Sequence, residues 1–170
     1  MLFLPYRVKN PWKHFPYTTV AIIAVNVLVY SLTTESFLHI REEVVEGYAF
    51  QFGVSSFMSL FYAMFLHQDI FHIGGNMLFL WVFGPAVEDR LRPGRYLLVY
   101  FATGIVGALL QSFIDTAAGH SAPCIGASGC IMGVMGAYWY LFSWSTVCVF
   151  YWIFIRLGVW EIDAFWVIGG

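Results

Sequence analysis

The chain has 170 residues, of which 60% are hydrophobic, 20% aromatic and only 11% charged, and its formal net charge is −2. Soluble globular domains do not have this composition, so we expect an integral membrane protein whose main partner is the lipid bilayer. A nearly neutral chain without a long run of basic residues is not predicted to bind nucleic acid.

The apolar residues are concentrated in segments long enough to cross a membrane. Residues 1–15 are predicted to form a short cytoplasmic segment without a signal-peptide cleavage site, and residues 16–170 a transmembrane domain. A helix needs about 20 largely apolar residues to span the bilayer, with roughly 17 as the lower limit. We therefore predict four complete spans, over residues 16–32, 70–86, 96–114 and 125–142.

The segments between and after these spans have a different character. Residues 33–69 mix acidic and aromatic side chains, which is typical of a segment that lies in the headgroup layer. Residues 143–163 are also expected to lie at the cytoplasmic interface, because their apolar run is short and charged residues follow it. Residues 164–170 are predicted to begin a fifth, incomplete span, so the expected fold is an all-α polytopic helical bundle.

Basic residues are distributed unevenly along this arrangement. Arg7, Lys9 and Lys13 precede the first span and Arg90, Arg92 and Arg95 follow the second, whereas the first loop has only Arg41. The positive-inside rule then places the N-terminus in the cytoplasm. The second and fourth helices must both begin at the outer leaflet.

Polar side chains lie at the beginning of these two helices. Asp69 is a predicted N-cap, and His72 and Asn76 are four residues apart, which places them on one helical face. Ser128 opens the fourth helix, where unpaired N–H groups and the helix dipole favour a developing oxyanion. Topology brings these groups to a similar depth, as an acyl-transfer site requires.

The motifs at these positions resemble those of the rhomboid intramembrane serine proteases, in their compact bacterial form. The matching residues are Asn10-Pro11, Phe65-Leu66-His67, His72, Gly75-Asn76-Met77-Leu78-Phe79, Val87-Glu88, Arg90-Leu91, Gly126-Ala127-Ser128-Gly129 and Gly136-Ala137-Tyr138. Neither half of the pattern is specific alone, but Gly-x-Ser-Gly together with His-x-x-x-Asn on an earlier span is specific.

The resemblance implies a role for each matched residue. Ser128 is expected to be the nucleophile, His72 and Asn76 to supply the oxyanion hole, and His67 to have a supporting role. Gly126 and Gly129 flank the serine and let a substrate backbone approach. The implied substrates are transmembrane segments of other proteins, and no metal or organic cofactor is implied. A bacterial inner membrane is the expected location, with an organelle membrane as the alternative.

One family feature has no counterpart in the sequence. The general base of the family is a histidine on a sixth helix, in a His-x-Gly-Gly motif, and Val167 stands before Ile168-Gly169-Gly170. The five histidines are His14, His39, His67, His72 and His120. The chain is therefore expected to be truncated before that helix. The alternative function is a pseudoprotease that binds transmembrane helices without cleaving them, and His72 as a substitute base is a further alternative.

Structural roles compete with these functional ones. Gly129, Gly133 and Ala137 form a small-residue pattern that favours close helix packing, and the third span has a similar pattern at Gly104 and Gly107. His72 and Asn76 could join two helices as a polar pair.

Two other features are read as structural. Glu88, Asp89 and Arg90 are predicted to form a solvated or locally paired turn. The three cysteines lack metal-ligand spacing and are expected to be buried thiols. A small channel or transporter is a weaker alternative function, because paired intramembrane charges and broken repeats are missing from the pattern.

Overall fold

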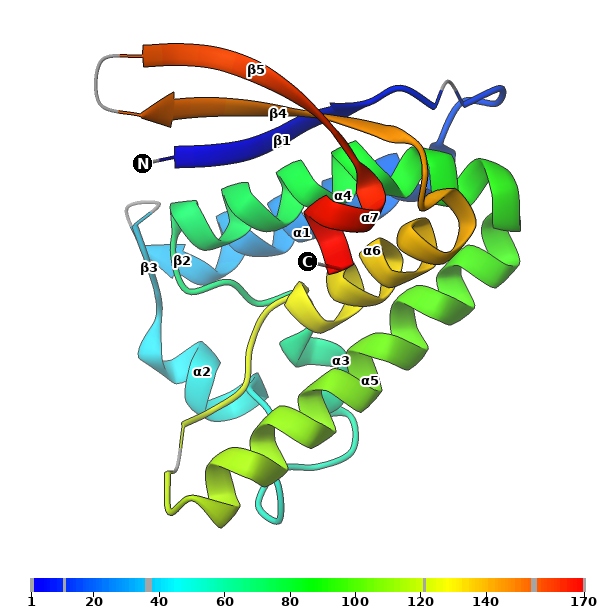
Figure 1. Cartoon of the computed structure of the whole chain (residues 1–170). Coiled ribbons are helices and arrows are strands. Elements are labelled where there is room, and N and C mark those ends of the chain that lie inside the picture. Colours follow the sequence, from blue (N-terminus) through cyan, green and yellow to red (C-terminus); the bar gives the residue numbers. More distant parts are fainter. Residues whose placement is uncertain (1, 11, 36–37, 121, 154–155, 170) are drawn as a thin grey trace.

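The computed structural model describes residues 2–10, 12–35, 38–120, 122–153 and 156–169, so Gly170 of the predicted fifth span lies outside the described residues. The helices are α1 (Tyr17–Thr33), α2 (Glu42–Tyr48), α3 (Ser59–Ala63), α4 (Ile70–Leu91), α5 (Pro93–Ala117), α6 (Ser128–Phe142) and α7 (Ala164–Gly169). The strands are β1 (Leu2–Val8), β2 (Thr34–Glu35), β3 (His39–Ile40), β4 (Thr146–Ile153) and β5 (Arg156–Asp163). The longer helices form a bundle, and β1, β4 and β5 lie along one side of it (Figure 1).

Helices α4 and α6 run in the same direction through the bundle, and α1 and α5 run the opposite way (Figure 1). We call the end at which α4 and α6 begin the serine end. The other end, at which they finish, is called the basic end. This arrangement agrees with the connectivity predicted from the sequence.

The lengths of these helices differ more than the sequence predicts. Within the described ranges, α4 with 22 residues and α5 with 25 are long and apolar enough to cross a membrane. Helix α1 has 17 residues and α6 has 15. A helix rises about 1.5 Å per residue, so α6 is shorter than a hydrocarbon core of about 30 Å.

Close packing of α5 against α6 follows from their small residues. A Cβ atom built on Gly107 would lie 3.2 Å from the Cα atom of Gly129, and a Cβ atom on Gly133 would overlap Thr103. The two backbones therefore approach more closely than larger side chains would allow. The packing role predicted for these glycines is confirmed.

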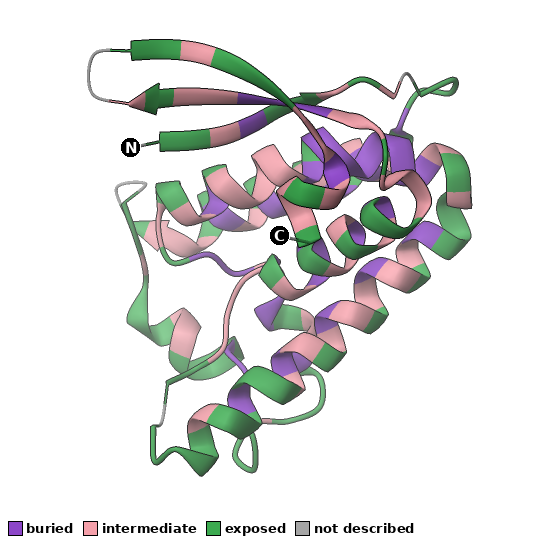
Figure 2. Cartoon of the chain, viewed as in Figure 1, coloured by how far each residue is buried: buried purple, intermediate pink, exposed green. Residues whose placement is uncertain are grey.

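The core lies between the four longer helices (Figure 2). Its most deeply buried members include Leu80, Phe83, Val87, Tyr96, Tyr100, Val134 and Tyr138. Large apolar side chains also cover the outside of the bundle, as expected where lipid is the solvent.

A three-stranded antiparallel sheet is the main departure from the all-α prediction. Its strand order is β1-β4-β5, and Leu4 of β1 pairs with Phe150 of β4. The stretch 143–163, expected at the interface without strands, thus forms a β-hairpin, and segment 1–15 contributes the third strand. The prediction was wrong because it compared the length of the apolar run only with the length of a membrane-spanning helix and did not consider a strand. The β-branched and aromatic residues of Thr146–Ile153 favour a strand.

The turn predicted at the end of α4 is only partly as expected. Glu88 is not solvated: it is 5% exposed, and its carboxylate accepts hydrogen bonds from the N–H groups of Thr18 and Thr19, both at 2.8 Å. The hydroxyl of Thr19 donates a third bond at 2.7 Å. Glu88 therefore caps the N-terminus of α1 from another helix. Asp89 is paired, but not locally: its carboxylate lies 2.6 Å from Nδ1 of His14, which precedes it by 75 residues.

Candidate active site

The turn that precedes α6 places Ser128 at the surface of the serine end. Gly126 has φ +115°, a conformation that residues with a Cβ rarely adopt, and its N–H donates to the carbonyl of Ala63 at 2.8 Å. Ala127 is fully buried, and Ser128 is the first, exposed residue of α6. The N–H groups of this first helical turn point away from the helix and remain available to an anion.

His72 and Asn76 lie directly against this turn. A Cβ atom built on Gly126 would be 2.8 Å from both Cε1 and Nε2 of His72 and 3.9 Å from Nδ2 of Asn76. Only a glycine leaves room for the imidazole at this point. The structure thus brings together the serine turn and the two side chains that the sequence predicts as its neighbours.

The orientation of these two side chains is set by α4. Asp69 caps the helix, since its Oδ1 accepts the N–H of His72 at 2.8 Å, as predicted. The side-chain nitrogen of Asn76 is buried and has no hydrogen-bond partner in the described part of the chain. A buried amide donor without a partner is unusual in proteins, and it leaves one strong donor beside the serine turn.

His67 lies behind His72. Its ring is fully buried, its Nδ1 is 3.2 Å from the carbonyl oxygen of Phe65, and the two imidazole centroids are 5.1 Å apart in an edge-to-face arrangement. Burial, and secondarily the neighbouring His72, lower the pKa of His67 to about 4. His67 is therefore neutral at physiological pH and packs against the predicted oxyanion-hole histidine.

None of the other histidines of the described residues is hydrogen-bonded to the serine. His14 pairs with Asp89 at the basic end, and His39 lies in β3. Within the described ranges, the Ser128 hydroxyl makes no hydrogen bond to a histidine. Nor do the described residues contain a group of three or more histidine, cysteine or acidic side chains able to hold a metal ion.

The first loop holds the serine turn in place, which the sequence did not reveal. Phe50 and Cys124 exchange two backbone hydrogen bonds, of 3.1 and 2.8 Å, and Ala63 accepts the N–H of Gly126. Leu60 and Ala63 bury their side chains against Ala108 of α5. These contacts are made largely by backbone groups, so no residue pattern in the sequence predicts them.

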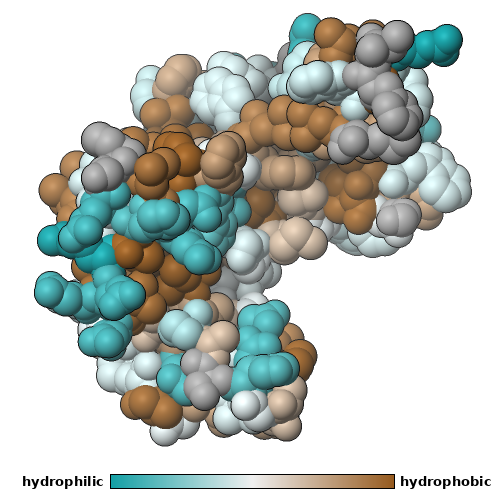
Figure 3. All heavy atoms as spheres, turned by 90° about the vertical axis from the view of Figure 1, so that its left-hand side faces the viewer, coloured by the Kyte–Doolittle hydropathy of each residue, from teal (hydrophilic) through white to brown (hydrophobic). Residues whose placement is uncertain are grey.

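The face that contains this loop and the serine end is only partly polar. Hydrophilic residues form several groups on this face, and each group borders hydrophobic surface (Figure 3). Such a boundary is expected where a membrane protein meets water.

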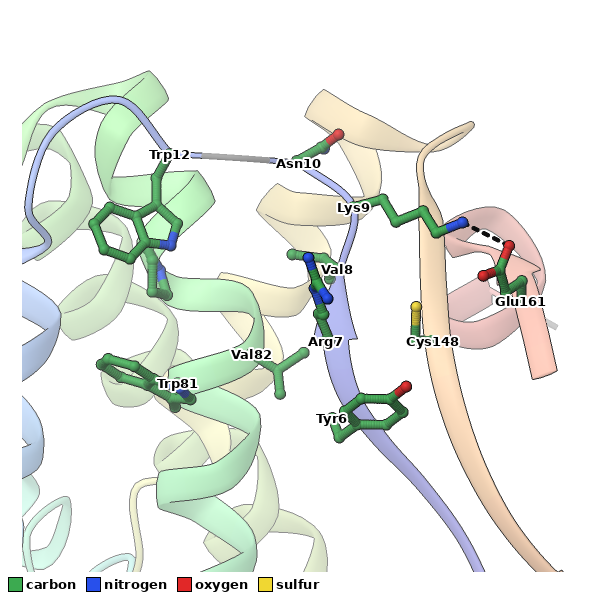
Figure 4. A pocket seen from close by; sticks show the side chains of 11 residues that line it. Tyr6, Arg7, Val8, Lys9, Asn10, Trp12, Trp81, Val82, Cys148 and Glu161 are labelled. Carbon is green, nitrogen blue, oxygen red and sulfur yellow. Dashed lines mark hydrogen bonds and ion pairs between the residues drawn. The ribbon is translucent and has the colours of Figure 1, made fainter. Parts of the chain in front are cut away.

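A large cavity lies elsewhere, between β1 and α4. It has a volume of about 660 Å³ and contains the side chains of Arg7 and Trp81 (Figure 4). Lys9 and Glu161 also line it, and they form an ion pair of 2.6 Å (Figure 4). None of the predicted site residues lines this cavity, which we therefore separate from the serine site.

Comparison with known proteins identifies the family. The model of the family described as Rhomboid domain matches residues 54–169. The chain is 33% identical over 99 residues to Rhomboid protein 1, mitochondrial, of Saccharomyces cerevisiae, an alignment that covers 57% of the chain and 29% of that protein. It is 43% identical over 76 residues to Rhomboid protease GluP of Bacillus subtilis, covering 45% of the chain and 14% of the protease.

A third relative is the human Presenilin-associated rhomboid-like protein, mitochondrial, with 30% identity over 121 residues. That alignment covers 71% of the chain and 31% of the human protein. The chain spans less than a third of the length of each of these three relatives. It belongs to the rhomboid family, which confirms the predicted family and makes the chain a polytopic, largely helical integral membrane protein.

Proposed function

We propose that the chain is the scaffold of an intramembrane serine endopeptidase, which cleaves peptide bonds in or near transmembrane segments of other membrane proteins. Ser128 is the nucleophile. His72, Asn76 and the backbone N–H of Ser128 form the oxyanion hole, while His67 positions His72. Gly126 and Gly129 leave space for the substrate backbone and for close helix packing. The family is generally one of serine proteases, although it includes inactive members.

The contact between Gly126 and His72 carries this proposal. A Cβ atom at position 126, which glycine lacks, would lie 2.8 Å from the imidazole of His72. The turn that contains Ser128 therefore packs directly against this ring. The unpartnered donor of Asn76 borders the same space. A carbonyl attacked by Ser128 would develop its negative charge there, between two side-chain donors and the first turn of α6.

The chemistry requires a base as well as an oxyanion hole. Serine attacks poorly unless a neighbouring group accepts its proton. With His67 neutral and His72 placed as a donor, no histidine of the described residues is hydrogen-bonded to the Ser128 hydroxyl as its proton acceptor. The second candidate function is a rhomboid-like pseudoprotease that binds transmembrane helices without cleaving them, since the family includes inactive members.

The membrane arrangement proposed with this function has four spans, formed by α1, α4, α5 and α6, with α7 as the beginning of a fifth. The basic end carries Lys13, Arg90, Arg92 and Arg95, which supports a cytoplasmic position for that end and for the N-terminal segment 1–15. The serine end then lies toward the outer face, from which water reaches Ser128. The compact core of the chain fits a bacterial inner membrane.

A serine-directed fluorophosphonate distinguishes the two functions. We expect the purified protein to be labelled at Ser128, and Ser128→Ala to be neither labelled nor able to cleave a model transmembrane substrate. Labelling that persists in Ser128→Ala would exclude the assigned nucleophile. A folded protein that is not labelled, but becomes labelled when free imidazole supplies the base, would establish the pseudoprotease function with an intact oxyanion hole.

A further inference from the structure

The basic end of the bundle contains a hollow that the proposed proteolytic site does not use. It has a volume of about 480 Å³ and lies between the N-terminal segment, the end of α4 and Phe142 of α6. Lys13, Arg90 and Arg92 line it, together with the exposed indole of Trp12. Three cations therefore surround one concave surface at an end of the membrane helices.

The neighbouring carboxylates do not neutralise these cations. Neither of the two ion pairs found among the described residues includes Lys13, Arg90 or Arg92. Asp89 also lines the hollow, but its oxygens accept the N–H groups of Lys13 and His14, at 3.1 and 3.2 Å, and pair with the His14 ring. Glu88 is turned inward, onto the first turn of α1. The hollow is left with an excess of positive charge, which favours an anion.

The backbone of Arg92 gives an independent indication that its side chain is needed. Arg92 joins α4 to α5 with φ 69° and ψ 157°, and it is the one residue other than glycine with positive φ among those described. This region of conformational space is almost restricted to glycine, so an arginine here is strained. Glycine would form the same junction more easily, but it would remove a guanidinium whose planar fork suits a phosphate.

The position of the hollow indicates which kind of anion it binds. The ends of membrane-spanning helices lie at the level of the lipid headgroups, where phosphate groups are concentrated. The cavity between β1 and α4 adjoins the hollow through Asn10 and Trp12, and Arg7 and Trp81 lie in it (Figure 4). From this combination we infer that the hollow binds the phosphate group of an anionic phospholipid, whose glycerol and acyl part lies along Trp81 of α4.

The inference is tested with the full chain in neutral detergent micelles. Added phosphatidylglycerol is expected to raise the unfolding temperature in a saturable manner, because a ligand that binds only the folded state stabilises it. Phosphatidylcholine at the same concentration is expected to raise it much less. Arg92→Gly should bind phosphatidylglycerol about tenfold more weakly, since it loses a charge-assisted hydrogen bond, without lowering the unfolding temperature of the lipid-free protein.

Arg95→Gln is the matched control. It removes one positive charge from the same end, but Arg95 does not line the hollow, so the response to phosphatidylglycerol should persist. An equal loss of response in Arg95→Gln and Arg92→Gly would overturn the site in favour of a diffuse surface charge. An equal response to phosphatidylcholine would also overturn it. Inorganic phosphate that reproduces the full stabilisation would show a free-anion site and refute a lipid.

Discussion

The two ends of the helix bundle differ in whether their buried polar groups have hydrogen-bond partners. At the basic end, Glu88 is buried and its carboxylate accepts three hydrogen bonds from Thr18 and Thr19. At the serine end, Nε2 of His67 and Nδ2 of Asn76 are buried and have no partner among the described residues. Two other buried polar atoms without a partner in the described part of the chain, Oδ1 of Asn26 and the hydroxyl of Tyr100, lie in the core between the helices, so the contrast holds for the two ends and not for the whole bundle.

The energies involved make this difference informative. An unsatisfied buried donor costs about 1–3 kcal/mol, which is a large fraction of the stability of a small protein. The side-chain nitrogen of Asn76 is such a donor, and it lies 3.9 Å from the Cβ position of Gly126. A group that gains its hydrogen bond only from a reacting substrate contributes to catalysis and not to folding.

The largest predicted effect is that of Asn76→Ala on reactivity. The rate of Ser128 labelling or substrate cleavage should fall about a hundredfold or more, as for the loss of one oxyanion donor. The free energy of unfolding should change little, because the amide nitrogen has no partner to lose. Asn26→Ala is the control: Asn26 donates to the Ile22 carbonyl at 2.8 Å in the core, so that variant should lose stability but keep its rate per folded molecule.

Glu88→Ala should show the opposite pattern. Removal of the carboxylate leaves the N–H groups of Thr18 and Thr19 unpaired and should lower the free energy of unfolding by about 3 kcal/mol. Denaturation in mixed micelles measures this change. Glu88→Gln keeps one acceptor oxygen and should lose less. Labelling of Ser128 per folded molecule should not change, and a loss of labelling at full occupancy of the folded state would contradict the comparison.

The third prediction concerns pH. The pKa of His67 is lowered from 6.5 to about 4 in the folded protein, so the unfolded state binds the proton more tightly. The contribution of neutral His67 is complete above pH 6.5 and is lost as the pH falls toward 4, by roughly 2–3 kcal/mol. His67→Phe should make the unfolding free energy less dependent on pH over this interval. An unchanged slope would show that His67 is not buried as a neutral ring.

The smallest effect separates steric crowding from backbone strain. Gly126 and Gly119 both have positive φ, but a Cβ on Gly119 would meet nothing within 4 Å. Gly119→Ala should therefore show the strain alone, about 1 kcal/mol, whereas Gly126→Ala should lose roughly 1 kcal/mol more because it displaces His72. Thermal unfolding of the two variants gives the difference. Equal losses would mean that the imidazole is not held against Gly126.

Local patterns predicted a good part of this molecule. The N-cap Asp69, the glycine contact between α5 and α6 and the meeting of His72 with the serine turn follow from spacing and from the order of the spans. Each depends on a property that one segment carries by itself, such as a helical repeat or a small side chain.

The remaining features depend on pairing between distant segments. Strand β1 pairs with β4, which follows it by more than a hundred residues, and nothing in Leu2–Val8 specifies that partner. The local sequence of Glu88 predicts a solvated or locally paired turn, whereas its hydrogen-bond donors come from α1. The carbonyl of Ala63 accepts the N–H of Gly126, and no side-chain pattern in the sequence predicts this contact. Short apolar strands and backbone acceptors are the parts that sequence patterns do not identify.

The central claim is that Ser128, His72 and Asn76 surround one reacting oxygen. The most direct measurement is a structure of the protein after reaction with a fluorophosphonate. The account predicts phosphonylation of Ser128, with the phosphoryl oxygen about 3 Å from Nδ2 of Asn76 and directed toward the His72 ring. A phosphoryl oxygen that points away from both side chains would contradict it, as would modification of another residue while Ser128 stays free.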